Sequence, residues 1–134
     1  MYPKTAKMID RLADRTSEGK VNWEQTADER IFQVAFPNYS VTISSERTSN
    51  DPEPEYVVSI LNDSGLLVEQ VTADDLEEYV SETYSHSIER SGAYANKLLE
   101  KLYENARGHA MGVGRAVDQI LGELGEDDSS DIPF

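Results

Sequence analysis

The sequence predicts an α+β fold, in which a four- or five-stranded antiparallel sheet is covered on one face by one N-terminal helix and by C-terminal helices. Two observations predict this class. Apolar residues alternate with a period of two between residues 21 and 72, and helical periods stand before and after that stretch. Because 134 residues suffice for one hydrophobic core, we expect a single domain over residues 1–125 and a flexible acidic tail over residues 126–134.

The segment from Thr5 to Ser17 predicts a short amphipathic helix. Gly19 follows it and is a natural stop, because glycine adopts the left-handed conformation that often ends a helix. The apolar residues of this segment recur at helical spacing and are Ala6, Ile9, Leu12 and Ala13.

Five runs predict the strands of the sheet. The first three are VNWEQ, RIFQVAF and YSVTI, and Pro37-Asn38 lies between the second and third, where a tight reversal is favourable. Residues 48–55 contain two prolines among polar and acidic residues, so they are predicted to form a loop. The last two runs, residues 55–61 and 66–72, flank the turn sequence NDSG and therefore predict a hairpin.

Helical periodicity returns in the C-terminal part of the chain. Thr72 can cap a short helix that starts near Asp74. Gly108, Gly112 and Gly114 then separate two apolar stripes, which predicts a break or sharp kink between two helices. The first stripe consists of Tyr94, Leu98, Leu99, Leu102, Tyr103 and Ala106, and the second of Val113, Val117, Ile120, Leu121 and Leu124.

The composition disfavours several functional classes. With 12 Lys and Arg against 26 Asp and Glu, the net charge of -14 repels phosphate backbones and anionic membranes. Trp23 and the tyrosines could stack on bases, but the predicted strands lack the interleaved basic residues of such surfaces. There are no cysteines, and no apolar run is long enough for a signal peptide or a membrane span. We expect a cytoplasmic protein that binds neither nucleic acid directly nor membranes.

The body offers no recognisable catalytic constellation. His86 and His109 have no second ligand at a metal-binding spacing, so solvated surface positions are favoured for both. The glycine-rich residues 107–115 follow a helix and lack the Lys-Ser/Thr ending of a phosphate loop, which favours a helix–helix turn. The acidic residues within 74–78 lack the central glycine of a calcium loop. We therefore expect no catalytic residue, no metal and no cofactor.

The C-terminal sequence EDDSSDIPF, unlike the body, contains a recognisable functional signal. Its acidic part is too polar to fold alone, whereas Ile132 and Phe134 offer two apolar anchors beside an α-carboxylate, and Pro133 stiffens the chain in an extended form. Such a segment suits a protein partner with an apolar pocket and a basic rim. The predicted partner-binding residues are Asp127, Asp128, Asp131, Ile132, Pro133 and Phe134.

This tip resembles the acidic Ile-Pro-Phe tail of bacterial single-stranded-DNA-binding proteins, over the last nine residues only. In that family the tail is a docking peptide for replication, repair and recombination enzymes, so the resemblance implies a similar docking role here. The basic, aromatic-lined barrel of that family is missing, and its DNA binding is not implied. The body is similar to a group of small uncharacterised bacterial proteins in the stretches LADRTSEGKVNW, YVVSILNDSG and LLEKLYENARGHAMGVGRAVDQIL.

Three interpretations of function remain. The favoured one is a non-enzymatic interaction module that docks through its tip onto genome-maintenance proteins. The alternatives are an acidic nucleic-acid mimic, such as a phage-type inhibitor of a DNA-binding enzyme, and a domain whose tail is merely solubilising. An enzyme is remote, because no catalytic constellation is recognised.

Overall fold

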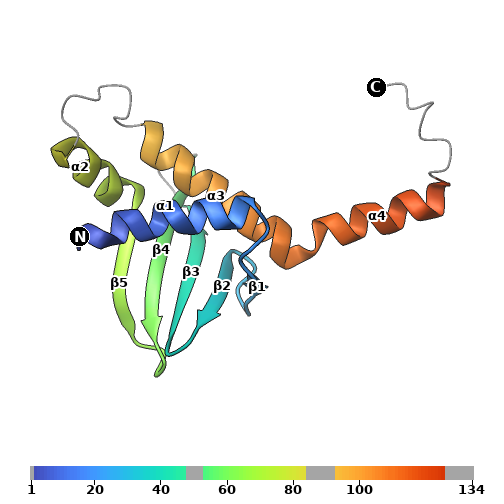
Figure 1. Ribbon diagram of the computed structural model, residues 1–134, viewed down its shortest axis with the longest axis horizontal. Coiled ribbons are helices and arrows are strands. Elements are labelled where there is room, and N and C mark those ends of the chain that lie inside the picture. The colour runs from blue at the N-terminus through green and yellow to red at the C-terminus, as the bar shows by residue number, and fades with distance from the viewer. Residues whose placement is uncertain (1, 48–52, 84–92, 126–134) are drawn as a thin grey trace.

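The computed structural model describes residues 2–47, 53–83 and 93–125 (Figure 1). Its five-stranded antiparallel sheet, N-terminal helix and C-terminal helices confirm the predicted α+β class. The elements in chain order are α1 (Pro3–Ser17), β1 (Glu24–Gln25), β2 (Ile31–Phe36), β3 (Tyr39–Glu46), β4 (Glu55–Asn62), β5 (Leu67–Thr72), α2 (Ala73–Thr83), α3 (Ala93–Met111) and α4 (Val113–Leu124).

The strands form an antiparallel meander in the order β1-β2-β3-β4-β5. β1 is shorter than the run VNWEQ predicted, because the backbone N–H of Trp23 donates to the carbonyl of Val21 at 3.1 Å in a local turn, and the chain joins the sheet only at Glu24. The central β3–β4 pairing is the longest, from Tyr39 opposite Asn62 to Glu46 opposite Glu55. Most of the predicted loop over residues 48–55 lies outside the described residues.

The two hairpin turns fall where the sequence predicted them. Asn38 has a φ of 71°, in the left-handed region that asparagine tolerates better than most residues. In the second turn the Asn62 side-chain oxygen accepts hydrogen bonds from the backbone N–H groups of Ser64 and Leu66, both at 3.0 Å. Gly65 supplies the positive φ, 80°, that this turn requires.

Local sequence signals also define the helix ends. α1 begins at Pro3, and Gly19 ends it with a φ of 74° while its N–H donates to the Thr16 carbonyl at 3.0 Å. At the start of α2 the Thr72 hydroxyl accepts from the Asp75 N–H, and the Asp75 carboxylate accepts from the Thr72 N–H. This reciprocal pair is a capping box, and it confirms the predicted cap.

The core lies between the sheet and helices α1, α2 and α3. In Figure 1, α1 and α3 cross the upper part of the strands, and α2 lies beside the upper end of β5. Trp23 is buried in it, and its indole N–H donates to the buried Thr16 hydroxyl at 3.0 Å. The fully buried large side chains are Ile9, Trp23, Phe32, Ile43, Val58, Val71, Leu76, Leu99 and Leu102.

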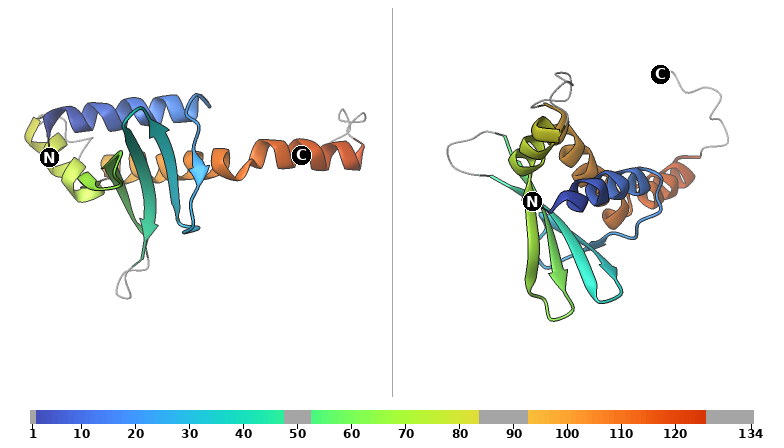
Figure 2. Two further views of the ribbon diagram at one scale, coloured as in Figure 1. Left: turned by 90° about the horizontal axis from the view of Figure 1, so that it is seen from below. Right: turned by 60° about the vertical axis from the view of Figure 1, so that its left-hand side comes forward.

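The sheet extends beyond its helical cover at the hairpin ends. Figures 1 and 2 show the β2–β3 and β4–β5 turns reaching past α1. Phe36, Tyr39 and Leu67 stand on these ends and are about half exposed, at 47%, 51% and 56%. Phe36 shares the face of the buried Phe32 and Val34, but α1 covers only the part of that face nearest the core.

α4 differs from the expectation that the C-terminal helices pack on the sheet. The break predicted in the glycine-rich stretch is present, at Gly112 with a φ of 69°, whereas Gly108 and Gly114 lie within helices. Beyond Gly112, α4 extends away from the sheet and the other helices, and none of its residues is buried (Figure 2).

Candidate docking surfaces

The six predicted partner-binding residues lie outside the described residues, within 126–134. The structure does describe α4, the helix that precedes that segment in the chain. α4 ends at Leu124, and Gly125 follows with a φ of 77°, a left-handed conformation that ends the helix. The tail therefore starts at the far end of a helix that projects from the body (Figure 1).

α4 is amphipathic but unpartnered among the described residues. Its apolar residues recur at spacings of three and four, so they form one stripe along the helix. Their exposed fractions range from 37% at Leu121 to 76% at Leu124. The stripe consists of Val113, Val117, Ile120, Leu121 and Leu124.

A groove runs beside α1, on the side toward the exposed end of β2. Its volume is about 520 Å³, within the range of small-molecule pockets. Its apolar floor is formed by Met8 and Leu12 of α1, by Val21 from the segment before β1, and by Phe36 at the end of β2. We call this feature the α1 groove.

Basic side chains border the α1 groove. Lys4, Lys7, Arg11 and Arg15 are spaced by three or four residues and therefore share one face of α1, and Lys20 follows the helix. These are five of the chain's 12 Lys and Arg residues, gathered on one side of a protein with a net charge of -14. The α1 groove is thus a positive site on a negative molecule.

Few acidic groups neutralise this basic row. Glu18 contacts two of its members, with Arg15 at 3.4 Å and Lys20 at 3.8 Å, and all three side chains are about half exposed. Within residues 2–47, 53–83 and 93–125, no carboxylate lies within ion-pair distance of Lys4, Lys7 or Arg11. The N-terminal half of the row is therefore available to an anionic partner.

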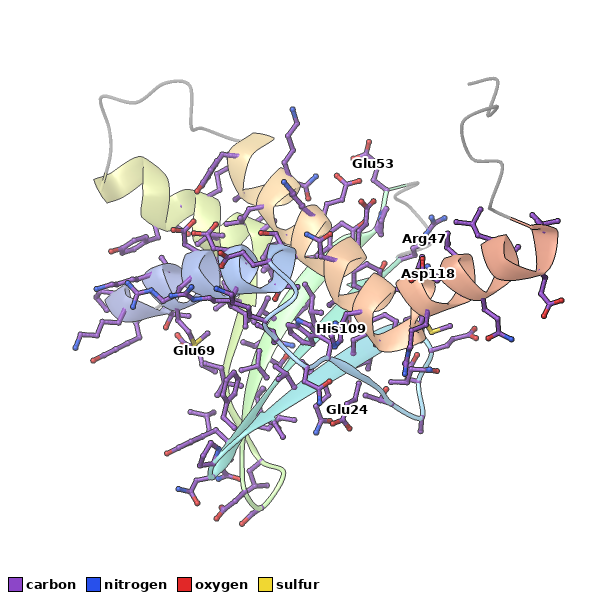
Figure 3. All side chains as sticks on the ribbon, turned by 45° about the vertical axis from the view of Figure 1, so that its right-hand side comes forward. Glu24, Arg47, Glu53, Glu69, His109 and Asp118 are labelled. Carbon is purple, nitrogen blue, oxygen red and sulfur yellow. The ribbon has the colours of Figure 1, made fainter. Side chains whose placement is uncertain are left out.

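Two contacts fix α1 relative to the sheet and so shape the groove. At the N-terminal end the Glu69 carboxylate of β5 accepts from the Thr5 hydroxyl at 2.6 Å and from the Tyr2 N–H at 3.1 Å. Figure 3 shows Glu69 close to the N-terminal half of α1. At the other end, the hydrogen bond from Trp23 to Thr16 holds the segment that carries Val21 against the helix.

Among the described residues, the titratable groups are not arranged as a recognisable acid–base pair. His109 is exposed at the end of α3 (Figure 3), where its Nε2 lies 3.3 Å from the Asn22 side-chain oxygen, and His86 lies outside the described residues. Burial raises the pKa of Tyr56 and of Tyr103 above the ordinary value, and hydrogen bonds from Arg30 lower the pKa of Asp28. Among the residues that the structure describes, no three His, Asp or Glu residues are grouped to hold a metal ion.

Several aromatic side chains pack in the core. Trp23 and Tyr56 are buried, and Tyr103 packs its ring against Phe32 and Tyr56, with centroid distances of 5.6 and 5.3 Å. Tyr39 is exposed but does not line the α1 groove, and among the described residues that line it Phe36 is the single aromatic residue beside the basic row. This arrangement differs from a base-stacking groove, where aromatic and basic side chains alternate.

The α1 groove was not predicted from the sequence. The periodic row of Lys4, Lys7, Arg11 and Arg15 is the sequence signal that identifies a basic helix face. The contributions of Val21 and Phe36 could not be identified in the same way, because they come from separate segments that meet only in the folded chain.

Comparison of the chain with protein-family models, with curated proteins and with solved structures finds no match. None of the helices in the described part of the chain combines the length and the apolar character that crossing a bilayer demands.

Proposed function

We propose that this protein is a non-enzymatic interaction module of the cytoplasm, which docks through its C-terminal tip onto genome-maintenance proteins. The observation that carries the proposal is the position of α4. This helix makes no buried contact and leads away from the body, so it presents the start of the tip at a distance from the sheet.

The dimensions of α4 suit a docking arm. Its 12 residues rise about 18 Å along the helix axis, at about 1.5 Å per residue. The nine residues that follow can extend by up to about 30 Å more. A partner can therefore bind the tip without contacting the sheet, which removes steric conflict between the two folded bodies.

The chemistry of the tip defines the partner's site. Ile132 and Phe134 supply apolar surface for a pocket, and Pro133 between them limits the backbone entropy lost on binding. The carboxylates of Asp127, Asp128 and Asp131 require Lys or Arg around that pocket. In this proposal the partner is a protein, and neither nucleic acid nor a membrane is contacted directly.

The alternative is an acidic mimic of nucleic acid that inhibits a DNA-binding enzyme. The net charge of -14 supports it. Such a mimic would have to use a face other than that of the α1 groove, where the five basic residues carry the opposite sign. A mimic acts through its folded surface, so removing the tip should leave its inhibition intact.

Calorimetric titration against a bacterial protein that docks Ile-Pro-Phe tails tests the proposal. The full chain should bind, and Phe134→Ala should weaken binding by about 2 kcal/mol or more, which is roughly 30-fold. Residues added after Phe134 should have a similar effect, because they displace the α-carboxylate from its basic partner.

Matched variants separate the tip from the rest of the chain. Leu124→Ala changes an exposed apolar residue of α4 and should leave the affinity within about twofold. Charge reversal at Asp127 or Asp128 should mainly slow association, with an effect that added salt masks. Absence of binding, or binding indifferent to both changes at Phe134, would contradict the proposal and favour the mimic or the solubilising tail.

A further inference from the structure

We propose that the α1 groove is a receptor for residues 126–134 of a second copy of this chain. The groove and the tail have complementary chemistry. The groove combines an apolar floor with a basic border, and the tail combines an acidic stretch with two apolar residues. Docking of one on the other joins two molecules and covers the tip.

Charge favours this occupant. Residues 126–134 carry four acids, at positions 126, 127, 128 and 131, and no basic residue. The α1 groove carries five basic residues, and Lys4, Lys7 and Arg11 have no carboxylate within ion-pair distance among the described residues. Two copies of a chain with a net charge of -14 repel each other as a whole. The basic α1 groove is a local exception, because it attracts an acidic segment.

The apolar contacts determine the orientation of the tail. Phe36 and Met8 expose apolar surface that only a hydrophobic group can cover favourably, and Ile132 and Phe134 provide such groups. With the apolar end of the tail on this floor, the acids at 126–128 lie along the row of Lys and Arg on α1. The volume of about 520 Å³ suits a group of small-molecule size, such as the side chains of Ile132 and Phe134, rather than a whole helix.

The direction of α4 favours a second copy over the same chain. A tail that turned back along α4 would use about 18 Å of its reach of about 30 Å merely to return to the start of that helix. About 12 Å of reach, three or four extended residues, would then remain for the groove, which is too little to place both the acids and the apolar end of the same tail on it. The tail of another molecule has no such restriction, so the expected contact is head-to-tail between copies.

Sedimentation velocity of the full chain over a range of concentrations tests this inference. We expect reversible self-association that weakens as salt is added. The variant K7E/R11E reverses two charges of the groove and should weaken the association at least tenfold. A loss of this size is typical when close charge pairs across an interface are disrupted. Phe36→Ser, which leaves the basic row unchanged, should weaken it as well.

A matched control reverses two charges elsewhere. Lys97 and Lys101 are exposed on α3, four residues apart like Lys7 and Arg11, and they do not line the groove. K97E/K101E therefore changes the net charge equally and should alter self-association by less than about twofold. Circular dichroism of each variant checks that the fold is retained.

Complementation provides the decisive comparison. K7E/R11E has an intact tail, Phe134→Ala has an intact groove, and each alone should associate weakly. Their mixture should form heterodimers, because one intact tail can meet one intact groove. A mixture that stays monomeric overturns the inference, as does self-association that is absent in the parent chain or equal in K7E/R11E and K97E/K101E.

Self-association through the α1 groove can be tested separately from the affinity of the tip for other proteins. In calorimetry against a tail-docking bacterial protein, K7E/R11E should bind at least as tightly as the parent chain, because fewer tips are covered by second copies. If the groove variants leave self-association unchanged while Phe134→Ala still weakens that titration, the receptor role fails and the proposed function stands.

Discussion

Replacing Thr16 with valine removes the hydroxyl that accepts the Trp23 indole N–H and preserves the approximate shape of the side chain. The two residues are only 6% and 2% exposed, so water cannot readily replace the lost acceptor. A buried donor left without a partner costs about 1–3 kcal/mol. Threonine and valine have similar helix propensities, so we assign this loss to the hydrogen bond.

Urea unfolding measures the effect. With a typical slope of about 1–3 kcal/mol per molar urea, the midpoint of Thr16→Val should fall by roughly 1 M at unchanged slope. Circular dichroism follows the helices, and the fluorescence of Trp23, the single tryptophan, follows the site itself. The two probes should report one transition if unfolding is two-state.

A double-mutant cycle isolates the hydrogen bond. In a Trp23→Phe background the N–H is absent, so Thr16→Val should cost little or even stabilise, which gives a coupling energy of about 1–2 kcal/mol. If Thr16→Val is as stable as the parent chain, or costs the same in both backgrounds, the hydrogen bond does not anchor α1 as inferred.

Three further changes test the packing, the tyrosines and the turn. Ile9→Ala should lower the free energy of unfolding by about 2–5 kcal/mol, whereas Ile120→Ala on exposed α4 should change it by less than about 0.5 kcal/mol, as measured by urea unfolding. Because burial raises the pKa of Tyr56 and Tyr103, these tyrosines lose their protons at lower pH in the unfolded chain than in the folded one, so stability should fall as pH rises above about 10. Alkaline absorbance titration of the folded chain should show tyrosines that ionise late, and Tyr103→Phe should remove part of that late ionisation. Asn38→Val should destabilise the turn by about 1–2 kcal/mol, and Asn38→Gly should be nearly neutral.

Each of these has a contrary result. Equal losses for the two isoleucine variants would mean that α4 is covered in solution. Tyrosines that all ionise together, with stability constant above pH 10, would contradict the burial of the two phenols. A harmless Asn38→Val would show that the turn relaxes to a different conformation.

The sequence predicted the local features of the fold well, because each depends on residues close together in the chain. The capping box at Thr72 requires only an acid three residues later. The turns at Asn38 and Gly65 require residues that tolerate a positive φ between two runs of alternating pattern. The break at Gly112 is also a local feature, because it requires only glycines between two apolar helical stripes.

Features that depend on distant segments were not predicted. The stripe on α4 has the period of a buried helix, but periodicity defines which face is apolar and not what covers it. The run VNWEQ alternates like a strand, yet burial of Trp23 against Thr16 diverts its first part from the sheet. The α1 groove requires α1, the segment before β1 and the end of β2 to meet, which no local pattern specifies.

The junction at Gly112 also has a consequence for proteolysis. A protease needs a segment that can leave its surroundings at little cost in free energy, and α4 gives up no buried side chain when it unwinds. A single cut near this junction would release residues 113–134 and leave the sheet, α1, α2 and α3 with their packing intact. Because peptide hydrolysis is irreversible under cellular conditions, one cleavage would permanently separate the tip from the folded body.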